Sequence, residues 1–414
     1  MRRTRVLFIS YDGLTDPLGQ SQILPYIFQL QTSGRQFTIL SFEKPDRYRR
    51  LSPQLRRQLE ERNIHWHPLS FTRRPRYLAK GWDLLRMYAL AMALTLSRRI
   101  QVVHCRSYQA GQVGLFLQRL FSVQMVFDMR GLWADERVDG GLWKMEKPFQ
   151  WLLYHSYRRL ERQMLRNADQ IVTLTRRSLP TITQRCPERD LPLWVIPCCA
   201  DFEHFQLASP THRARIRQEL GLTDGDLLLG YLGSLGTWYL LREMFQFFAV
   251  LLEHQRHAHL FLITMDWQPQ HEQIWQECGL DGVRHRLHIR PATREEVPQV
   301  LSALDLAVSF ILPSFSKQAS SPTKVAELLA TGIPLVCNQG VGDVQEQMEQ
   351  FQAGICIQDF SRPELVKAAV AIPQILGQRG QALRQRAATA LDLSVAARIY
   401  LRIYAALDEK ARPI

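Results

Sequence analysis

Short apolar segments alternate with longer amphipathic segments along most of the chain. In its first half, the apolar runs of strand length lie at residues 5–10, 37–42, 64–69, 102–105, 124–129 and 170–175. Segments with helical spacing, such as residues 20–31 and 77–98, separate these runs. Strands that alternate with helices pair in parallel, with helices covering both faces of the sheet. We therefore expect an α/β protein.

A second series of the same kind follows the strand that ends at residue 196. Its predicted strands lie at residues 227–232, 259–264, 286–290, 304–310, 334–337 and 354–357. A polar stretch at residues 209–223 separates the two series. We predict two Rossmann-like doubly wound domains, residues 1–195 and 196–394, that face one another across a cleft, and a C-terminal helix (395–414) that packs across their joint. In such sheets ligands bind beyond the carboxyl ends of the strands.

Charge and composition limit the classes of partner that this protein can have. The 414 residues carry a net charge of +13, and up to residue 205 there are 32 basic against 18 acidic residues. A basic surface attracts phosphates, nucleic acid or an anionic membrane. No nucleic-acid recognition motif accompanies it, so we expect no nucleic-acid partner. The seven cysteines lack metal or disulfide spacing, and no segment has the length of a membrane span, which together favour a cytoplasmic protein.

The most informative segment is residues 313–334, which begins where a predicted strand ends. Ser320 or Ser321 is a good N-cap and Pro322 suits the first helical position. The N–H groups at such a helix start, with Thr323 and Lys324, can bind a diphosphate. Glu327, on roughly the same face, could accept hydrogen bonds from ribose hydroxyls. The alternative is an ordinary capped helix with a solvated Lys–Glu pair.

This segment resembles the donor-binding segment of the retaining nucleotide-sugar glycosyltransferases of family 4, which have the GT-B fold. Residues 16–22 (DPLGQSQ) and Val195-Ile196-Pro197 followed by Asp201 agree in order and spacing. The resemblance implies transfer of a sugar from a nucleoside diphosphate sugar, bound by the second domain, to a hydroxyl acceptor, bound by the first. It also implies retention at the anomeric carbon, no metal and no cofactor, and a role in polysaccharide or glycolipid synthesis.

The sequence departs from the family pattern at three places. Ala319 stands where the first of two glutamates is usual, and Ser234 and Tyr239 replace an arginine and a lysine that touch the diphosphate. We expect Lys317 and Lys324 to supply the missing charge, because a diphosphate needs compensating cations. Other donor-binding candidates are Gly233, which permits close approach of the backbone, Ser321, and Arg290, near which we place the base.

In the first domain, the candidates follow predicted strands. They are Gly19, in the loop after the first strand; Arg106, which replaces a histidine usual in the family; Arg130; and Glu136. Arg130 can hold a phosphate, and Glu136 could orient an acceptor hydroxyl or act as a base. Arg106, Arg130 and Glu136 form the predicted catalytic set with Lys324. The alternatives are a plain turn at Gly19 and a structural salt bridge between Arg130 and Glu136. His104 is expected to be a packed residue.

Several other interpretations stay open. Asp224-Gly225-Asp226 has the form of a metal site, but its place before a strand favours a turn. The charged residues missing at Ala319, Ser234 and Tyr239 also fit a protein of this fold that has lost catalysis and acts as a membrane-associated scaffold. The fold also fits a sugar-nucleotide epimerase.

We further expect peripheral docking on an anionic inner membrane surface, where a lipid-linked glycan acceptor would be met. The basic residues for this are Arg47, Arg49, Arg50, Arg56, Arg57, Arg73, Arg74, Arg76, Lys80, Arg98 and Arg99, beside Trp82, Leu84, Leu85, Met87 and Tyr88.

Overall fold

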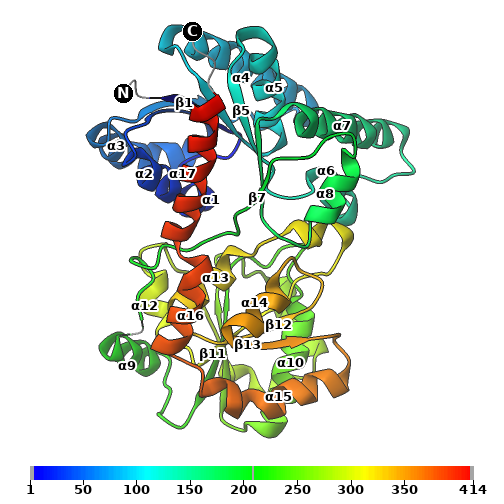
Figure 1. Cartoon of the computed structure of the whole chain (residues 1–414). Coiled ribbons are helices and arrows are strands. Elements are labelled where there is room, and N and C mark those ends of the chain that lie inside the picture. Colours follow the sequence, from blue (N-terminus) through cyan, green and yellow to red (C-terminus); the bar gives the residue numbers. More distant parts are fainter. Residues whose placement is uncertain (1–3, 208, 411–414) are drawn as a thin grey trace. The chain divides into compact units, whose positions relative to one another are not determined.

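The chain divides into two compact units in the computed structural model, which describes residues 4–207 and 209–410 (Figure 1). The first unit combines Met1–Pro197 with Leu393–Ile414, and the second is Cys198–Asp392. The sequence placed these boundaries at 195/196 and 394/395. The C-terminal helix, which we expected to pack across the joint of the two domains, belongs to the first unit.

The first unit is built on a sheet whose described strands all pair in parallel, in the order β3-β2-β1-β4-β5-β6-β7. The strands are β1 (Arg5–Ser10), β2 (Gln36–Glu43), β3 (His65–Ser70), β4 (Val102–Arg106), β5 (Gln124–Asp128), β6 (Gln170–Thr173) and β7 (Leu193–Val195). Strands β4 and β5 are almost wholly buried. Burial on both faces explains why these strands read as unbroken apolar runs.

Helices cover this sheet. They are α1 (Pro17–Gln22), α2 (Leu24–Gln31), α3 (Pro45–Glu61), α4 (Arg76–Arg98), α5 (Ser107–Phe121), α6 (Trp133–Asp139), α7 (Pro148–Asn167), α8 (Leu179–Arg185) and α17 (Leu393–Lys410). Helix α17 packs alongside α2, although the two are far apart in sequence (Figure 1). The edge-to-face pair of Tyr26 and Tyr400, with ring centroids 6.0 Å apart, lies in this contact.

The second unit repeats the plan, with the parallel order β10-β9-β8-β11-β12-β13. Its strands are β8 (Leu227–Leu232), β9 (Ala258–Ile263), β10 (Leu287–Arg290), β11 (Leu306–Ser309), β12 (Leu335–Asn338) and β13 (Gly354–Ile357). Its helices are α9 (Pro210–Glu219), α10 (Leu241–His254), α11 (Pro269–Glu277), η1 (Asp281–Arg286), α12 (Val297–Leu301), η2 (Phe315–Ala319), α13 (Thr323–Ala330), α14 (Val344–Phe351), α15 (Arg362–Leu376) and α16 (Gln381–Leu391).

Both sheets therefore have the doubly wound topology, and the predicted fold class is confirmed. In each sheet the strand order reverses at one place, between β1 and β4 in the first unit and between β8 and β11 in the second. Ligands of such sheets bind at this reversal, beyond the carboxyl ends of the strands. The loops that follow β1, β4, β8 and β11 are accordingly the places to look for a site.

One element differs from the sequence expectation. The polar stretch at residues 209–223, expected as a connection, contains helix α9. Its apolar periodicity is weak because charged side chains make part of its contacts: Arg217 is buried and pairs with Asp305, with Nη1 3.1 Å from Oδ2. A buried arginine in a polar helix cannot be distinguished from an exposed one by its hydrophobic pattern.

Candidate functional site

The loops that follow β8 and β11 lie side by side in the second unit. Tyr239 and Ile311 form an isolated antiparallel bridge between them. The backbone N–H of Leu240 donates to the carbonyl of Phe310 over 3.1 Å, and that of Leu312 to the carbonyl of Trp238 over 2.9 Å. These bonds hold the end of the loop that follows β8 against the start of the segment that leads into α13.

Lys324, in the first turn of α13, is the centre of this site. Its ammonium donates to the hydroxyl of Tyr231 over 2.8 Å and lies 4.2 Å and 3.6 Å from the ring centroids of Tyr231 and Tyr239. Burial lowers the pKa of Lys324 well below its usual value, although the charge of Glu327 acts in the opposite direction. A cation held this way, between aromatic rings and with little solvent, would gain from an anion.

Gly233 approaches the same ammonium. Its backbone has a φ of +128°, and a Cβ at this position would lie 2.8 Å from Lys324 Nζ. A side chain here would therefore push the ammonium aside and strain the backbone. Gly233 and Lys324, predicted from separate motifs, are brought together by the structure.

The aromatic walls of this site were not found from the sequence. Tyr239, predicted only to replace a lysine, packs against the ammonium of Lys324. Trp238 packs against the ammonium of Lys317, whose Nζ is 3.6 Å from the centroid of the indole ring. Tyr231 was read only as a strand residue. An aromatic residue in a strand is ordinarily core, so no local signal marked Tyr231 as a partner of Lys324.

Glu327 lies one turn after Lys324. Its side chain is 13% exposed, and Arg294 Nη1 is 3.7 Å from its Oε1. Burial raises the pKa of Glu327 to about 7, against the lowering effect of Arg294 and Lys324. The alternative of a solvated Lys–Glu pair is therefore wrong, because both side chains are largely removed from water. Arg294 was missed, since it lies in a loop without a motif.

Helix α13 begins differently from the prediction. Pro322 is the N-cap residue, the helix starts at Thr323, and no side chain caps it. The hydroxyl of Ser321 instead accepts a hydrogen bond from the backbone N–H of Cys198 over 3.0 Å. The predicted serine cap is thus wrong because Ser321 ties the start of the second unit to this segment.

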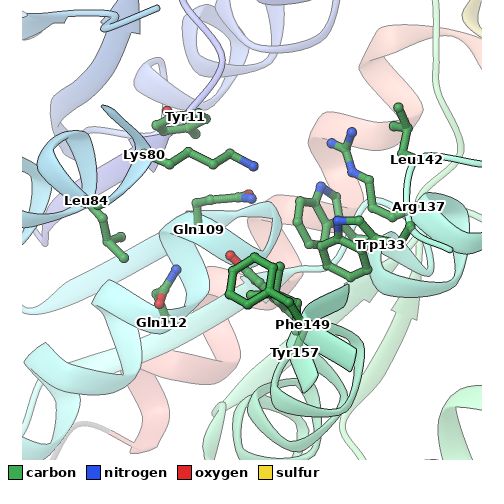
Figure 2. A pocket seen from close by; sticks show the side chains of 13 residues that line it. Tyr11, Lys80, Leu84, Gln109, Gln112, Trp133, Arg137, Leu142, Phe149 and Tyr157 are labelled. Atoms are coloured by element: carbon green, nitrogen blue, oxygen red, sulfur yellow. The ribbon is translucent and has the colours of Figure 1, made fainter. Parts of the chain in front are cut away.

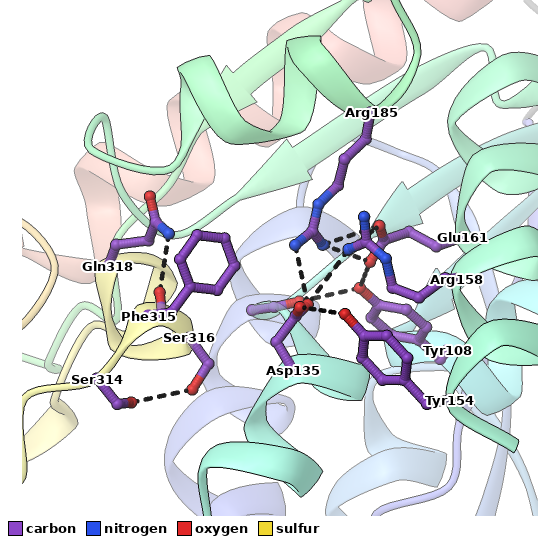
Figure 3. A network of polar contacts seen from close by, with 11 residues as sticks. Tyr108, Asp135, Tyr154, Arg158, Glu161, Arg185, Ser314, Phe315, Ser316 and Gln318 are labelled. Atoms are coloured by element: carbon purple, nitrogen blue, oxygen red, sulfur yellow. Dashed lines mark hydrogen bonds and ion pairs between the residues drawn. The ribbon is translucent and has the colours of Figure 1, made fainter. Parts of the chain in front are cut away.

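The segment before α13 forms the 3₁₀ helix η2, whose members Lys317 and Ala319 are buried. Figure 3 shows its local contacts: Ser314 and Ser316 lie with their hydroxyls 3.3 Å apart, and Gln318 Nε2 donates to the carbonyl of Phe315 over 2.8 Å. Ala319, in the place of the missing glutamate, is fully buried.

Two predicted donor-binding residues, Arg290 and Ser234, make contacts away from Lys324 and Gly233. Arg290, at the end of the edge strand β10, pairs with Glu219 of α9, with Nη1 2.9 Å from Oε2. The side chain of Ser234 is exposed, while its carbonyl accepts the hydroxyl proton of Tyr231 over 2.5 Å. Their contacts are with the protein itself, and their roles toward a donor stay predictions.

In the first unit, Arg106 and Arg130 are brought together around the carboxylate of Asp128. Their Nη1 atoms lie 3.7 Å from Oδ2 and 3.8 Å from Oδ1 respectively, and all three side chains are less than 10% exposed. Although burial opposes ionisation, Arg130, His104 and Arg106 keep the pKa of Asp128 below its usual value. Asp128 was not among the predicted site residues, because only the tertiary structure shows that it balances the charge of two arginines.

His104 is a packed residue, as predicted. It is 1% exposed, its Nδ1 is 2.8 Å from the hydroxyl of Tyr404, and its ring packs on Phe8 and Tyr400. Tyr400 donates to Asp128 Oδ2 over 3.2 Å. Helix α17 thus reaches the cluster of Asp128 and the two arginines from the far end of the chain.

The loop after β1 is organised by Glu43. Its carboxylate accepts hydrogen bonds from the backbone N–H groups of Leu14 and Thr15 over 2.7 and 3.0 Å. Gly19 packs on this loop, where a Cβ would lie 2.1 Å from the carbonyl oxygen of Gly13. Internal packing is thus sufficient to require this glycine. Glu136 lies on α6 and is half-buried.

A second buried polar network joins four helices of the first unit (Figure 3). Arg185 of α8 binds both Glu161 of α7, over 2.8 Å, and Asp135 of α6, over 2.9 Å. Tyr108 of α5 donates to Glu161, and Tyr154 of α7 donates to Asp135 over 3.0 Å. This network, which no motif indicated, fixes α6 relative to the helices around it.

Metal ligation has no support in the described ranges 4–207 and 209–410, where no three histidine, cysteine, aspartate or glutamate side chains are grouped to hold an ion. Asp226 instead closes a turn, since its Oδ2 accepts the backbone N–H and the hydroxyl of Thr223 over 2.6 and 2.8 Å. The interpretation of residues 224–226 as loop geometry agrees with these bonds.

Comparison with known proteins gives a family model that matches part of the chain and solved structures of similar fold. Residues 23–199 match the model of the glycosyl transferase 4-like domain. None of the curated proteins matches the chain.

Several solved structures are similar. HepE of Anabaena in complex with UDP and glucose is 14% identical, with a TM-score of 0.68 over 97% of this chain and 100% of that one. Sucrose-phosphate synthase from Thermosynechococcus elongatus is 16% identical, with a TM-score of 0.74 over 99% and 100%. WaaG, a glycosyltransferase involved in lipopolysaccharide biosynthesis, is 15% identical, with a TM-score of 0.66 over 95% and 99%. The likeness extends over both units of the chain.

Proposed function

We propose that this chain, whose residues 23–199 match the model of the glycosyl transferase 4-like domain, is a glycosyltransferase that moves a sugar from a nucleoside diphosphate sugar to a hydroxyl acceptor. The second unit would bind the donor and the first the acceptor. The observation that carries the proposal is the buried ammonium of Lys324. It lies against Gly233, in the first turn of α13, where the strand order of the second sheet reverses.

The proposed chemistry follows from that charge. As the glycosidic bond to the donor breaks, negative charge builds on the departing diphosphate. Lys324, the Thr323 N–H and the positive end of α13 would stabilise this charge, and Lys317 would add a second cation. Solved structures of HepE contain UDP and UDP-glucose, which supports a uridine diphosphate sugar as the first donor to test. Retention at the anomeric carbon is proposed from the resemblance to family 4.

The first unit would contribute Arg106 and Arg130. With Asp128 between them the two guanidinium groups carry a net positive charge, which suits a phosphate group. Glu136 is the proposed group that orients the acceptor hydroxyl. We propose synthesis of a glycan, polysaccharide or glycolipid as the setting, and the resemblance to WaaG supports that choice.

Product analysis tests the proposal. The full chain is incubated with UDP-glucose, with and without hydroxyl acceptors, and the products are identified by mass spectrometry. Acceptor-dependent release of UDP with a new glycoside is the expected result. A changed sugar nucleotide without acceptor would identify an epimerase, and no turnover with any nucleoside diphosphate sugar would favour the scaffold.

Donor affinity should depend on pH through Glu327. Its pKa near 7 means that the ionised carboxylate, which would accept hydrogen bonds from ribose hydroxyls, is lost as the pH falls. We expect the Kd for UDP-glucose to rise toward about tenfold per pH unit below pH 7, measured by calorimetry. Glu327→Ala should weaken binding by about 1–3 kcal/mol at pH 8.

Two variants make this measurement specific. Glu327→Gln should flatten the pH dependence, whereas Glu253→Gln, an exposed glutamate of α10 paired with Arg362, should leave it unchanged. UDP-glucose is suitable because its diphosphate has no proton to lose in this range. An identical pH profile for Glu327→Gln and the parent protein would place Glu327 away from the ribose.

Docking on an anionic inner membrane surface is also proposed. The part of the chain that the structure describes has no helix long and apolar enough to span a membrane. On α4, Trp82 and Leu85 are exposed, while Met87, expected with them, is fully buried and belongs to the core. The side chain of Arg76 lies outside the described part.

Vesicle co-sedimentation tests the docking. Binding to anionic vesicles at low salt should weaken about thirtyfold when Arg73 and Arg74 are reversed to glutamate, at about 1 kcal/mol for each basic group near the surface. Reversal of Arg362 and Lys367, exposed cations of α15 in the second unit, is the matched control. Failure of the parent protein to bind at low salt would refute this docking.

A further inference from the structure

Clustered cations lie in both units outside the candidate site. In the first unit, Lys80 and Arg137 line a cavity of about 320 Å³, and Lys80 Nζ and Arg137 Cζ lie 5.3 Å and 4.6 Å from the ring centroid of Trp133 (Figure 2). The face of an aromatic ring attracts cations, so Trp133 stabilises both. In the second unit, Arg213 and Arg379 meet instead at a neutral carbonyl. One neutral oxygen does not balance two positive charges, and this second cluster therefore indicates a ligand more strongly.

Arg379, in the turn between α15 and α16, makes a poor hydrogen bond. Its Nη2 donates to the carbonyl of Ser302 over 3.4 Å, beyond the usual range of about 2.7–3.2 Å. That carbonyl also accepts a bond of 3.4 Å from Arg213 Nη1, which has closer acceptors in the carbonyls of Ala303 and Leu304, at 2.8 and 3.2 Å. The Nε of Arg379 is buried and has no hydrogen-bond partner in the described part of the chain. Arg379 is thus the arginine of the cluster whose donors are least satisfied.

Among the residues described, Asp305 is the carboxylate that pairs with this cluster, and its oxygens are already used. Its Oδ1 accepts a hydrogen bond of 2.5 Å from Arg213. Its Oδ2 accepts bonds of 3.1 Å from Arg217 and of 2.7 Å from the backbone N–H of Leu228. The three arginines therefore bring three positive charges against one negative charge.

The excess positive charge acts on Arg379. Burial and the charge of Arg213 lower the pKa of Arg379, Arg217 acts in the same direction, and Asp305 opposes them. An arginine nonetheless stays protonated in proteins. Its charged form is therefore held at a cost in free energy, which a bound anion would offset.

The cluster lies at the far end of the second sheet from Lys324. Asp305 immediately precedes β11, whereas the segment that leads to Lys324 follows the carboxyl end of the same strand. The side chain of Arg213 is 26% exposed and Arg379 is partly exposed, so a small anion can reach both from solvent. An anion bound here would leave the candidate donor site open.

We propose that Arg379, with Arg213 and Arg217 beside it, forms a second anion site that binds a phosphate group. The phosphate would accept hydrogen bonds from the nitrogens of Arg379, since the planar fork of a guanidinium matches phosphate oxygens. Arg213 and Arg217 would add positive charge. The inference goes beyond the proposed function and does not depend on it, because the cluster contains no residue of the candidate site.

The residue after Arg379 connects this site to α13. The N–H of Gly380 donates to the carbonyl of Gly332 over 2.8 Å, and a Cβ on Gly332 would lie 2.7 Å from the carbonyl oxygen of Gly380. Gly332 lies just beyond the end of α13. A phosphate on Arg379 would therefore stabilise the turn that packs on this helix end, and we expect it to raise the melting temperature of the protein.

Calorimetric titration with inorganic phosphate tests the inference. It uses the full chain with Lys324→Met, so that the candidate donor site has lost its cation, at about pH 8, where phosphate is a dianion. Saturable binding is the expected result. Adding Arg379→Gln should raise the Kd at least about tenfold, the equivalent of one hydrogen bond to a charged group. Absence of saturable binding in Lys324→Met, or an unchanged Kd after Arg379→Gln, would overturn the inference.

Arg362→Gln is the matched control. Arg362, on α15 of the same unit, is 68% exposed and pairs with Glu253. Its replacement removes one positive charge at a distance from the cluster, so the Kd for phosphate should stay as it is. A loss as large as that of Arg379→Gln would show that phosphate responds to the net charge of the protein, which would contradict a site at Arg379.

Melting temperatures separate binding from a structural role. If Arg379 mainly held its turn through Ser302, Arg379→Gln would melt at a lower temperature without phosphate. In an anion site, the loss of a like charge should leave this temperature unchanged or raise it, and the rise that phosphate causes in the parent protein should be lost. A lower melting temperature with an undiminished rise on adding phosphate would make Arg379 a structural residue and refute the site.

Two further titrations identify the anion. Glycerol 3-phosphate carries the same dianion on an organic group, and tighter binding than that of inorganic phosphate would support a phosphate monoester as the ligand. Equal or weaker binding would support free phosphate. Chloride, with a single charge and no fork of oxygens, should bind at least about tenfold more weakly. Chloride binding as tight as that of phosphate would overturn the assignment.

Discussion

Replacing Lys324 with methionine is expected to lower kcat for sugar transfer by about two to three orders of magnitude, the usual loss when one stabilising charge or donor is removed from a transition state. The KM for the donor should change by less than about tenfold, because the charge on the diphosphate grows mainly as the bond breaks. Methionine keeps the aliphatic packing between Tyr231 and Tyr239. Steady-state release of UDP from UDP-glucose, with acceptor, measures both constants.

The melting temperature of Lys324→Met provides a control for its activity. Burial lowers the pKa of Lys324, so its charged form opposes folding of the unliganded protein. Lys324→Met should therefore melt at the same temperature as the parent protein or at a higher one. A loss of activity in this variant would then not be due to unfolding. Lys367→Met, at an exposed position of α15, should leave kcat unchanged. An unchanged kcat with a raised KM in Lys324→Met would make Lys324 a passive phosphate clamp.

Replacing Arg185 with leucine should lower the free energy of unfolding of the first unit by about 2–3 kcal/mol, because the buried carboxylates of Glu161 and Asp135 lose one arginine and keep the less buried Arg158 as their remaining cation. The carboxylates of Glu161 and Asp135 are 1% and 7% exposed, and Arg185 binds both (Figure 3). Leucine fills part of the volume but supplies no charge. Urea unfolding followed by tryptophan fluorescence measures the loss.

Arg162→Leu is the matched control. This arginine of α7 also forms a two-point contact with a carboxylate, that of Glu188, but both side chains are well exposed, at 59% and 30%. The variant should cost less than about 1 kcal/mol, as solvent-exposed pairs do. A cost for Arg185→Leu no larger than that of Arg162→Leu would show that the buried network does not hold α6, and with it Trp133, in place.

The candidate site could be predicted where its residues belong to one local segment. Lys324 and Glu327 follow a strand and open a helix, so their spacing alone places them on one helical face. Gly233 follows another strand in the same way. The aromatic partners of Lys324 could not be found, because Tyr231 is 93 residues away in the sequence and is typical of a buried strand. The serine cap was wrong because its hydroxyl binds Cys198, a contact invisible to helix-capping rules.

The sequence by itself determined the architecture of this protein. Its alternating apolar and amphipathic segments require parallel sheets covered by helices, since strands buried on both faces carry unbroken apolar runs. The tertiary structure decided what the side chains do. It removed Lys324 from water between two rings, placed Asp128 between two arginines, and gathered Lys80, Gln112 and Arg137 around one cavity. Desolvation and charge pairing depend on distances between residues far apart in the chain, which local spacing does not contain.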